Sequence, residues 1–537
     1  MEKEKAGFAS GLFYFTFVSM KFSVALLSIL LLGTFTFAQT HIVKINHTAN
    51  NPEEVTIAIN PLNPSHMAAA SNISNLYLTS DSGKTWSEHT MTSSLGVWGD
   101  PVLLYNNKGN LFYAHLNKNP IKQFPNWIDR IVVQASTNDG NKFNDGAAIG
   151  LNGNKVQDKP WMCADARNKK TYISWTEFDK YNSRNPLDRS RIRFSYADEN
   201  GKLWADPVVI SDTDGDCLDN DSTMEGATPA VDKQGNVYVA WSGLNQIYLD
   251  KSSDGGKTFG KDKVITSQIE GWDISLKKIY RTNGMPFLAC DTTSGPFSNR
   301  LYMSWSDMRN GDADVFLASS SDGGETWTTP LRVNNDSTKN GRDQFCNYLY
   351  IDPVTGTVYI IFYDRRNSPS VNFMDVYLAF SKDGGKTFLN RRITNSSFPC
   401  PGKAVFFGDY IGLNVFDGTV RPIWTDWDNY NLNIYTALLS QRDLELGNTE
   451  NKPSSLSLRC EQYTIWLHYH VPTGVKYSIS MRTGNKKFKV LKNGVGKGFD
   501  EEINITTLDI SDSEFEALLI AGKKTRIKAK VNISYND

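Results

Sequence analysis

The chain has 537 residues, of which 40% are hydrophobic and 21% charged, an ordinary globular composition with room for one large repeat domain and a smaller one. Its net charge of −1 excludes a protein that binds nucleic acid through a basic surface, because no surplus of Lys and Arg is present to neutralise phosphates. Aromatic residues make up 12% of the chain, which favours β structure, where flat rings pack on pleated surfaces.

The N-terminal segment has the features of a signal peptide. Met20-Lys21 precedes an apolar run over residues 24–37, whose end has the small-x-small pattern Thr36-Phe37-Ala38. Because the run is short for a membrane span, residues 1–38 are predicted to be a signal peptide that is cut after Ala38. An N-terminal anchor is the alternative, since the preceding stretch is also fairly apolar. The protein is therefore expected to be secreted or to stay at the cell surface, with no membrane span after cleavage.

A short motif of the pattern Ser-Asp-x-Gly-x-Thr-aromatic recurs along the chain. Four clear copies and two weaker ones occur, at Ser80–Trp86, Ser253–Phe259, Ser321–Trp327 and Lys382–Phe388, and at Asn138–Phe143 and Glu199–Trp204. The Asp and Ser side chains are expected to bond backbone groups within a turn, and Gly to supply a left-handed position. The closing aromatic residues lie 55 to 68 residues apart, which is enough for four short strands. We therefore interpret the motif as structural.

A second repeated element precedes the motif in each unit. It is a stretch rich in β-branched and aromatic residues, at Leu111–His115, Thr171–Trp175, Val237–Trp241, Leu301–Trp305, Val358–Phe362 and Arg421–Trp424. Another apolar strand comes before it, so each unit is strand, turn, strand, loop, strand, motif, strand, which is one β-propeller blade. A seventh unit, Tyr410–Leu439, has three strands and no motif. His41–Asn46 resembles the missing outer strand, so we predict an all-β propeller of seven blades closed by this strand, with six blades as the alternative.

The rest of the chain divides into a linker and a small domain. Residues 39–440 form the predicted propeller, the polar stretch 441–455 a linker, and 456–537 a β-rich accessory domain. Within that domain, Ser511–Glu514 is typical of a capping box that opens a short helix, which ends at Gly522. The six cysteines show no CxxC spacing, which argues against a zinc site; we expect buried free thiols, or one or two disulfides.

Two columns of polar, mostly acidic residues recur at the end of the blades opposite the motif, where loops converge on the central channel. The first precedes the inner strands and comprises Asp100, Asp158, Glu225, Asp343 and Asp409. The second follows the second strand and comprises Asn117, Glu177, Asp307, Asp364 and Asp426, with Arg309, Arg365 and Arg366 close behind. Glycoside hydrolysis needs one carboxyl group as acid and another as base or nucleophile, and facing carboxylates raise each other's pKa. The alternative is that these acids only cap strands.

These columns give the candidate site. The candidate catalytic residues are Asp343, Asp364, Asp307, Asp409 and Tyr410. The candidate substrate-binding residues are Asp100, Asp158, Glu225, Arg309, Arg342, Arg365, Arg366 and Asp426. His115 lies in the aromatic column and is expected to be packed in the blade, or else to be a general base for β-elimination on uronic acids.

One loop is a candidate calcium site. It places five carboxylates close together, at Asp212, Asp214, Asp216, Asp219 and Asp221, with Gly215 among them. Oxygen ligands of this kind suit a hard cation such as calcium, although the spacing is not that of a full EF-hand. A solvated acidic loop is the alternative.

The repeated motif, with the phrases Asp158-Lys-Pro-Trp161 and Ser304-Trp-Ser-Asp307, resembles the Asp-box (BNR-repeat) sialidase superfamily over about residues 41–440. The resemblance implies a β-propeller, and in the enzymes of the family one of six blades. It also implies a substrate carboxylate held by three arginines, the first in an Arg-Ile-Pro motif, a tyrosine nucleophile paired with a glutamate, and an aspartate acid/base. This chain departs from that pattern, because no arginine occurs between His41 and Trp127.

Three functions remain open on the sequence. The first is a glycoside hydrolase that acts on extracellular glycans and is sialidase-like in the broad sense, as the carboxylate columns favour. The second is a polysaccharide lyase on acidic sugars, for which His115 and the arginines would serve. The third is a propeller that binds a glycan or a protein without catalysis, which the missing arginine allows.

Overall fold

A computed structural model describes residues 40–368, 370–428 and 430–446, and beyond them seven strands between residues 455 and 532. Residues 40–440 form a seven-bladed β-propeller of antiparallel sheets. The predicted signal peptide, residues 1–38, lies outside the described residues. No helix within the described ranges is long and apolar enough to cross a membrane.

Four strands in chain order form each of the first three blades. Blade 1 contains β2 (Thr56–Ile59), β3 (Met67–Ser71), β4 (Asn75–Thr79) and β5 (Ser87–Thr90). Blade 2 contains β6 (Val102–Tyr105), β7 (Leu111–Leu116), β8 (Ile131–Ser136) and β9 (Ala147–Ile149). Blade 3 contains β10 (Val156–Asp165), β11 (Lys170–Phe178), β12 (Ser190–Asp198) and β13 (Val208–Val209).

The next three blades repeat the arrangement. Blade 4 contains β14 (Glu225–Val231), β15 (Val237–Gly243), β16 (Gln246–Ser252) and β17 (Lys263–Ser267), and is followed by the small pair β18 (Asp273–Ile274) and β19 (Thr282–Asn283). Blade 5 contains β20 (Phe287–Cys290), β21 (Leu301–Asp307), β22 (Asp314–Ser320) and β23 (Leu331–Arg332). Blade 6 contains β24 (Gln344–Ile351), β25 (Val358–Asp364), β26 (Phe373–Ser381) and β27 (Leu389–Arg392), with β28 (Phe398–Pro399) added to β26.

Both ends of the propeller contribute to blade 7. It contains β29 (Gly412–Phe416), β30 (Thr419–Asp428), β31 (Asn431–Ala437) and, as its outer strand, β1 (Ile42–Lys44); β32 (Leu439–Ser440) also pairs with β30. Ile42 lies opposite Ala437, and the amide of Ile45 donates to the carbonyl of Ile434 at 2.8 Å. The prediction that the N-terminal strand closes a seven-bladed ring is thus confirmed, and the six-bladed alternative is wrong.

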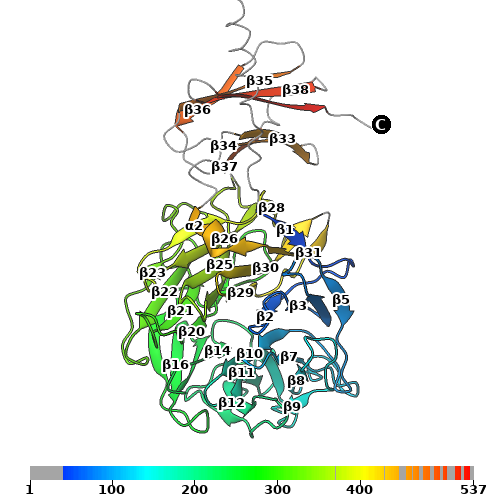
Figure 1. Cartoon of the computed structure of the whole chain (residues 1–537), viewed down its shortest axis with the longest axis vertical. Coiled ribbons are helices and arrows are strands. Elements are labelled where there is room, and N and C mark those ends of the chain that lie inside the picture. The colour runs from blue at the N-terminus through cyan, green and yellow to red at the C-terminus, as the bar shows by residue number, and fades with distance from the viewer. Residues whose placement is uncertain are drawn as a thin grey trace, which may run out of the picture. The chain divides into compact units, whose positions relative to one another are not determined.

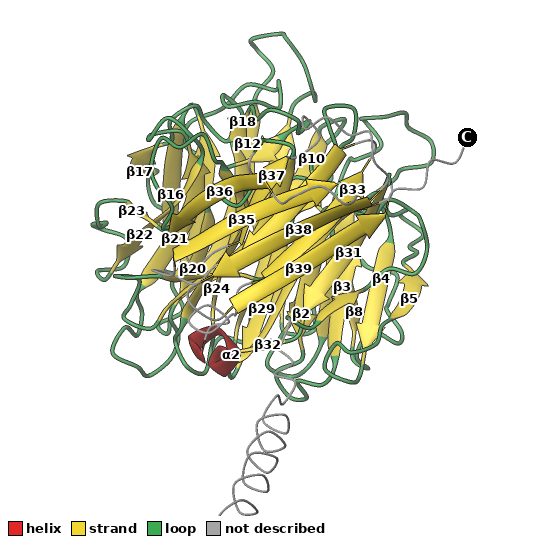
Figure 2. Cartoon of the chain, turned by 90° about the horizontal axis from the view of Figure 1, so that it is seen from above, coloured by secondary structure: helices red, strands yellow, loops and turns green. Residues whose placement is uncertain are grey.

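The first strands of the blades form the inner wall of the ring. They follow one another in the order β2, β6, β10, β14, β20, β24, β29 and back to β2. In Figure 1 the labels β2, β10, β14, β20 and β29 lie round the centre of the propeller, and β5, β9 and β23 lie at its edge. Figure 2 shows that nearly all of the described secondary structure consists of strands. Because neighbouring strands are antiparallel, the turns between second and third strands and the loops that enter the first strands share one end of the ring, which we call the loop face.

The repeated motif forms the turn between the third and fourth strands, at the end opposite the loop face. In blade 1, Asp81 accepts hydrogen bonds from the amides of Lys84 and Thr85 at 2.9 and 3.0 Å. The hydroxyl that completes the turn belongs to Thr79, which lies one residue before the motif; it donates to Asp81 at 2.8 Å and accepts from the amide of Gly83 at 3.2 Å. All these groups are used within the turn, as the structural interpretation of the motif predicts.

Large aromatic side chains on the second strands fill the spaces between blades. Trp175, Trp241, Trp305 and Trp424 are fully buried. Trp241 stacks on Tyr248 of the neighbouring strand, with centroids 5.8 Å apart. Removing a ring of this size from a packed core typically costs about 3–5 kcal/mol, so this column stabilises each blade.

The predicted linker begins as a helix. Residues 441–446 form α2 (Gln441–Leu446), and Ser440 and Asp443 bond each other reciprocally: the Ser440 amide donates to Asp443 at 2.8 Å, and the Asp443 amide donates to the Ser440 hydroxyl at 3.1 Å. This capping box, together with the burial of Leu444, stabilises a turn of helix where composition alone predicted a linker.

The C-terminal region is β-rich, as predicted. One sheet contains β33 (Ser455–Glu461), β34 (Thr464–His470) and β37 (Asp500–Asn504), and another contains β36 (Lys489–Val495), β35 (Lys476–Thr483), β38 (Glu514–Ala521) and β39 (Thr525–Asn532). The helix predicted after Ser511–Glu514 is wrong, because that stretch is the strand β38. It pairs on both sides, with β35 and β39, and this pairing overrides the local capping signal.

Five of the six cysteines lie in the described propeller, and all five are free thiols. They are Cys163, Cys217, Cys290, Cys346 and Cys400. The expectation of free thiols is therefore confirmed for these five, of which only Cys217 and Cys346 are buried, and the side chain of Cys460 lies outside the described residues.

Candidate functional site

Six carboxyl groups and two cations interact at the loop-face end of the inner wall, and we call them the channel cluster. The carboxyl groups are those of Glu54, Asp100, Asp158, Asp219, Glu225 and Asp409, and the cations are Lys159 and Arg281. Five of the carboxyl groups come from the entrances to the first strands of five different blades, whereas Asp219 lies in the loop before β14 and Arg281 in the insertion that contains β18 and β19. The ring closure therefore brings together residues that lie more than 350 positions apart in the chain.

Asp409 is the anionic centre of the cluster. Its Oδ2 lies 2.6 Å from Nζ of Lys159, and its Oδ1 accepts from Nε of Arg281 at 2.7 Å. Burial by itself raises the pKa of Asp409, but the two adjacent cations hold it well below its usual range. Asp409 is therefore ionised at neutral pH.

Four other carboxyl groups of the cluster have raised pKa values, in contrast to Asp409. Burial, followed by the charges of neighbouring acids, raises the pKa of Glu54 to about 7 and raises the pKa values of Asp100, Asp158 and Glu225 well above their usual range. Both carboxyl oxygens of Glu225 are buried without a hydrogen-bond partner. Such groups favour the protonated form, so the cluster holds protonated and ionised carboxyl groups side by side.

Asp158 and Asp219 are the two carboxyl groups of the cluster that solvent reaches most readily. Asp158 is partly exposed, and the side chain of Asp219 is 12% exposed. Burial raises the pKa of Asp219, but Arg281 at 2.7 Å and Lys159 together hold it below its usual range. The phenol of Tyr181 donates to Asp219 at 2.6 Å. The two acids interact electrostatically, so a carboxyl group that favours protonation interacts with one that favours ionisation.

Left-handed backbone positions recur where the cluster residues enter the blades. Glu54, Asp100 and Lys159 have φ values of 54°, 47° and 46°. A left-handed conformation costs energy for any residue with a Cβ, and such strain concentrates at functional sites. Three blades also share a shift in strand register, which begins at Asp158 in β10, at Glu225 in β14 and at Phe345 in β24.

This register explains why Asp343 is not part of the cluster. Phe345 occupies the position in blade 6 that Asp158 and Glu225 occupy in theirs, so Asp343 lies two residues too early. It pairs instead with the fully buried Arg365, whose guanidinium lies 2.9 Å away. Of the first predicted column, the structure brings together Asp100, Asp158, Glu225 and Asp409 and leaves Asp343 apart. Arg342 lies in the same loop as Asp343, where its amide donates to Asn340 at 2.7 Å.

Four aromatic rings from four blades pack at the centre of the ring. Trp161 lies 5.0 Å from Phe287, 5.8 Å from Tyr348 and 5.2 Å from Tyr410, measured between centroids. This packing removes water from the cluster residues next to it, and so accounts for the strong desolvation of their carboxyl groups. Tyr410 is buried in the packing, and burial together with the nearby acids raises its pKa well above the usual value. Its phenol therefore stays neutral, which disfavours its predicted role as a catalytic phenol.

Two acids of the second predicted column form ion pairs with arginines of their own blades. Asp307 binds Nε of Arg309 at 2.9 Å, and Arg309 lies over the ring of Phe316 at 4.6 Å. Blade 6 repeats this: Asp364 binds Arg366 at 2.7 Å, and Arg366 lies over Tyr377 at 4.2 Å. Both acids are fully buried by these contacts. The structure thus does not bring Asp307 and Asp364, predicted as catalytic, to the channel cluster.

The other members of that column also have partners outside the cluster. Asn117 donates to Asp129 at 3.0 Å, and Glu177 lies 3.2 Å from Lys155. Burial, followed by the charge of Asp428, raises the pKa of Asp426 to about 7. Asn117 and Glu177 thus strengthen the ends of blades 2 and 3, whereas Oδ1 of Asp426 is buried without a hydrogen-bond partner.

The five carboxylates of the predicted calcium loop point to different partners. Asp212 pairs with Lys261 at 2.9 Å, Asp214 with Arg191 at 3.0 Å, and Asp219 with Arg281 in the cluster. Asp216 accepts from the hydroxyl of Thr223 at 3.0 Å, and Asp221 accepts from the amide of Asp273 at 2.8 Å. Among the residues that the structure describes, no group of three or more His, Cys, Asp and Glu side chains is arranged to hold a metal ion.

His115 is packed in blade 2, as the simpler interpretation predicts. It is fully buried in β7, its Nδ1 lies 2.8 Å from the carbonyl of Leu116, and its ring centroid is 5.4 Å from that of Tyr113. Burial lowers its pKa to about 4. The ring is therefore neutral and inaccessible, which removes one of the two features that pointed to a lyase.

Replacing His115 with Phe, the residue type at the same position of blade 6, is expected to make stability less sensitive to acid. Burial lowers the pKa of His115 from 6.5 to about 4, so between these values the unfolded chain binds a proton that the folded chain does not. As the pH falls through this range, the linkage removes up to about 3 kcal/mol from the free energy of unfolding. Urea denaturation at neutral and acidic pH measures the effect, and an equal loss in both proteins would contradict the buried neutral histidine.

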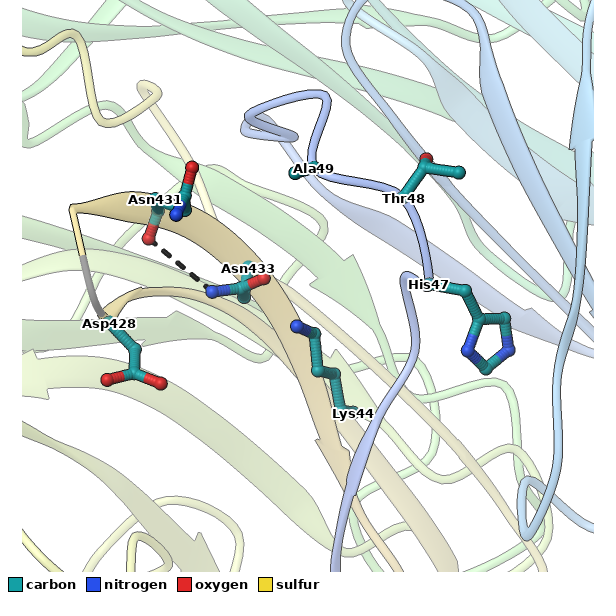
Figure 3. A pocket seen from close by; sticks show the side chains of 7 residues that line it. All are labelled: Lys44, His47, Thr48, Ala49, Asp428, Asn431 and Asn433. Carbon is teal, nitrogen blue, oxygen red and sulfur yellow. Dashed lines mark hydrogen bonds between the residues drawn. The ribbon is translucent and has the colours of Figure 1, made fainter.

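A separate pocket of about 220 Å³ lies where the N-terminal strand closes the ring (Figure 3). Its lining consists of Lys44, His47, Thr48, Ala49, Asp428, Asn431 and Asn433. The side-chain amide of Asn433 donates to the carbonyl of Asn431 at 3.5 Å, and Nε2 of His47 lies 2.9 Å from the carbonyl of Trp86. The pocket is polar, and its lining shares no residue with the channel cluster.

Sequence reasoning missed four residues of the site. Lys159 directly follows Asp158 in one of the quoted phrases, and Glu54 precedes the first strand of blade 1 as Asp100 precedes that of blade 2, so the repeat itself contained both signals. Arg281 lies in the insertion between blades 4 and 5, and Tyr181 lies in the loop between β11 and β12, outside the repeated positions. Only the fold reveals them.

Comparisons with known proteins give structural likenesses without a match in sequence. No family model matches the chain, and no curated protein matches its sequence. An α-L-arabinanase of Penicillium chrysogenum in complex with arabinobiose is 14% identical, with 76% of this chain and 99% of that chain covered and a TM-score of 0.40. A mutant of the NanB sialidase of Streptococcus pneumoniae is 7% identical, with 77% and 96% covered and a TM-score of 0.42. A polysaccharide lyase, an ulvan lyase, is 10% identical, with 76% and 98% covered and a TM-score of 0.43. At such low identities and TM-scores these likenesses establish no reaction for this chain.

Proposed function

We propose that the protein is a secreted glycoside hydrolase that cleaves extracellular glycans at the channel cluster. The observation that supports this most strongly is the pair Asp158 and Asp219, in which a carboxyl group with a raised pKa interacts electrostatically with one whose pKa is lowered. Two carboxyl groups in opposite protonation states are what acid/base cleavage of a glycosidic bond requires.

Each residue then has a distinct role. Asp158 donates its proton to the glycosidic oxygen as the bond to the sugar breaks. Asp219 stabilises the positive charge that develops on the sugar, either as a nucleophile or as the base that takes a proton from the attacking water. Asp409 orients Lys159 and Arg281, and these cations keep Asp219 ionised. If Asp219 is the nucleophile, water then cleaves the sugar–Asp219 ester and gives its proton to Asp158; if Asp219 is the base, it releases the proton taken from water to solvent, and solvent returns a proton to Asp158.

The charges of the cluster favour a neutral glycan over a sialoside or a uronate. Lys159 binds Asp409, and Arg281 binds both Asp409 and Asp219, so each cation of the cluster is already paired with a protein carboxylate. An anionic sugar would have to compete with these pairs and would face the remaining acids. The repeated motif suggests a sialidase-like reaction. We propose it only in the broad sense, as hydrolysis of a glycosidic bond.

An assay of the purified chain on a panel of glycans tests the proposal. The panel contains neutral polysaccharides, a sialoside and uronic-acid polysaccharides, and both new reducing ends and unsaturated uronates are measured. Reducing ends released from a neutral glycan are the expected result. Unsaturated uronates would mean a lyase, and glycan binding without cleavage of any substrate would mean a non-catalytic propeller; either outcome would overturn the proposal.

A further inference from the structure

We propose that Phe124, with Trp98 and Trp127, forms a stacking site for a neutral pyranose ring of the glycan chain, directly beside the channel cluster. We call these three residues the blade-2 aromatic group. The inference rests on the proposed function in one respect: the glycan that stacks on this group is taken to be the substrate that is cleaved at the channel cluster.

The three rings form one cluster of edge-to-face contacts. The centroids of Trp98 and Trp127 are 4.8 Å apart at 67°, and that of Phe124 lies 5.4 Å from Trp127 at 64° and 6.4 Å from Trp98. Phe124 is 56% exposed, whereas both tryptophans are partly buried. The tryptophans therefore pack against the phenylalanine and leave part of its surface open to a ligand.

Backbone hydrogen bonds fix the group to the end of blade 2. The amide of Trp98 donates to the carbonyl of Leu116 at 2.9 Å, and that of Asn119 donates to the carbonyl of Trp127 at 3.0 Å. Gly96 allows this close approach, since it has a φ of 74° and a Cβ there would lie 2.4 Å from the carbonyl oxygen of Lys118. Trp98 lies two residues before Asp100 of the channel cluster. Trp98 and Asp100 thus share the short stretch that enters blade 2, and Phe124 and Trp127 pack against it from the loop between β7 and β8.

The partners of the nearby cations favour a neutral sugar over an anionic one. The ammonium of Lys118 lies 4.6 Å from the ring centroid of Trp98 and 5.0 Å from that of Trp127, so its charge is engaged by the rings. Asp129 binds Lys122 at 2.9 Å and Arg130 at 2.7 Å, so each of the other two cations of this loop already has an ion-pair partner. An exposed ring with polar groups at its rim suits a pyranose, which has an apolar face and a periphery of hydroxyl groups.

Replacing Phe124 with Ala tests the inference, with Tyr430→Ala as the matched control. Tyr430 is a 71% exposed aromatic residue in the corresponding turn of blade 7. With a neutral oligosaccharide as substrate, Phe124→Ala is expected to raise KM about two- to twelvefold, the range of one aromatic contact, with the effect on KM and not on kcat. Phe124→Tyr should restore KM, and Tyr430→Ala should leave it unchanged. Equal KM values for Phe124→Ala and the unsubstituted protein would overturn the inference.

A binding measurement separates this inference from the proposed function. Titration of the full chain with neutral oligosaccharides, followed by tryptophan fluorescence, measures binding, and comparison with Phe124→Ala assigns it to the group, since the chain has 13 tryptophans. If no glycan is cleaved but binding still depends on Phe124, the stacking site stands and the proposed function fails. If cleavage occurs but fluorescence and affinity are the same in Phe124→Ala, the stacking site is wrong and the function stands. Binding of acidic glycans alone would also overturn the inference.

Discussion

Replacing Asp409 with Asn is expected to lower the free energy of unfolding by about 3–5 kcal/mol, the usual cost of breaking a buried ion pair by removing one partner. Asp409 is fully buried and pairs with Lys159, whose side chain is only 5% exposed, and with Arg281. Without Asp409 the buried ammonium of Lys159 loses its ion-pair partner, and the remaining carboxyl groups of the channel cluster cannot all be ionised to replace it. Urea denaturation followed by tryptophan fluorescence measures the loss.

A surface pair provides the control for this experiment. Glu445 binds Lys382 at 2.7 Å, but the two side chains are 39% and 60% exposed. Glu445→Gln is expected to cost less than about 1 kcal/mol, because solvent screens the pair. The double substitution Asp409→Asn with Lys159→Met should recover part of the stability lost in Asp409→Asn. A loss for Asp409→Asn as small as that for Glu445→Gln would show that the cluster does not hold the blades together.

Asp158→Asn is expected to lower kcat on the glycan substrate by about 10²–10⁴-fold, since the amide cannot protonate the leaving oxygen. Asp219→Asn should cause a similar loss, because it removes the ionised partner. Asp206→Asn changes an exposed carboxyl of the same blade and should leave kcat unchanged. Steady-state rates of reducing-end release measure all three. Full activity in Asp158→Asn would remove Asp158 from the role of acid.

The fold could be predicted from the sequence because it repeats. Each turn of the Ser-Asp-x-Gly-x-Thr-aromatic type uses its own side chains, so its signal is local, and an outer strand at His41–Asn46 had only one vacant position to fill. The helix predicted after Ser511 was wrong for the opposite reason. Its capping signal was local, but strand pairing on both sides decided the conformation.

The candidate site could be predicted only in part. Asp100, Asp158, Glu225 and Asp409 were found because they recur at the entrance to successive blades. Asp343 was wrongly assigned to the cluster, because Phe345, two residues later, has the place in β24 that Asp158 and Glu225 have in their strands. Arg281 could not be found, since it lies in an insertion between blades 4 and 5 and reaches Asp409 across 128 residues. Electrostatic partners of this kind follow from the closed ring and not from the repeat.

The pH dependence of kcat/KM on the glycan substrate tests the central claim most directly, because it shows whether one carboxyl must be protonated while another is ionised. The pKa of Asp219 is held below the usual range and that of Asp158 is raised well above it. We therefore predict a bell-shaped profile with a broad plateau: activity falls at acidic pH as Asp219 gains a proton, and falls at a pH above the ordinary carboxyl range as Asp158 loses one. A profile that rises once through an ordinary carboxyl pKa and then stays flat into alkaline pH would contradict the proposed acid.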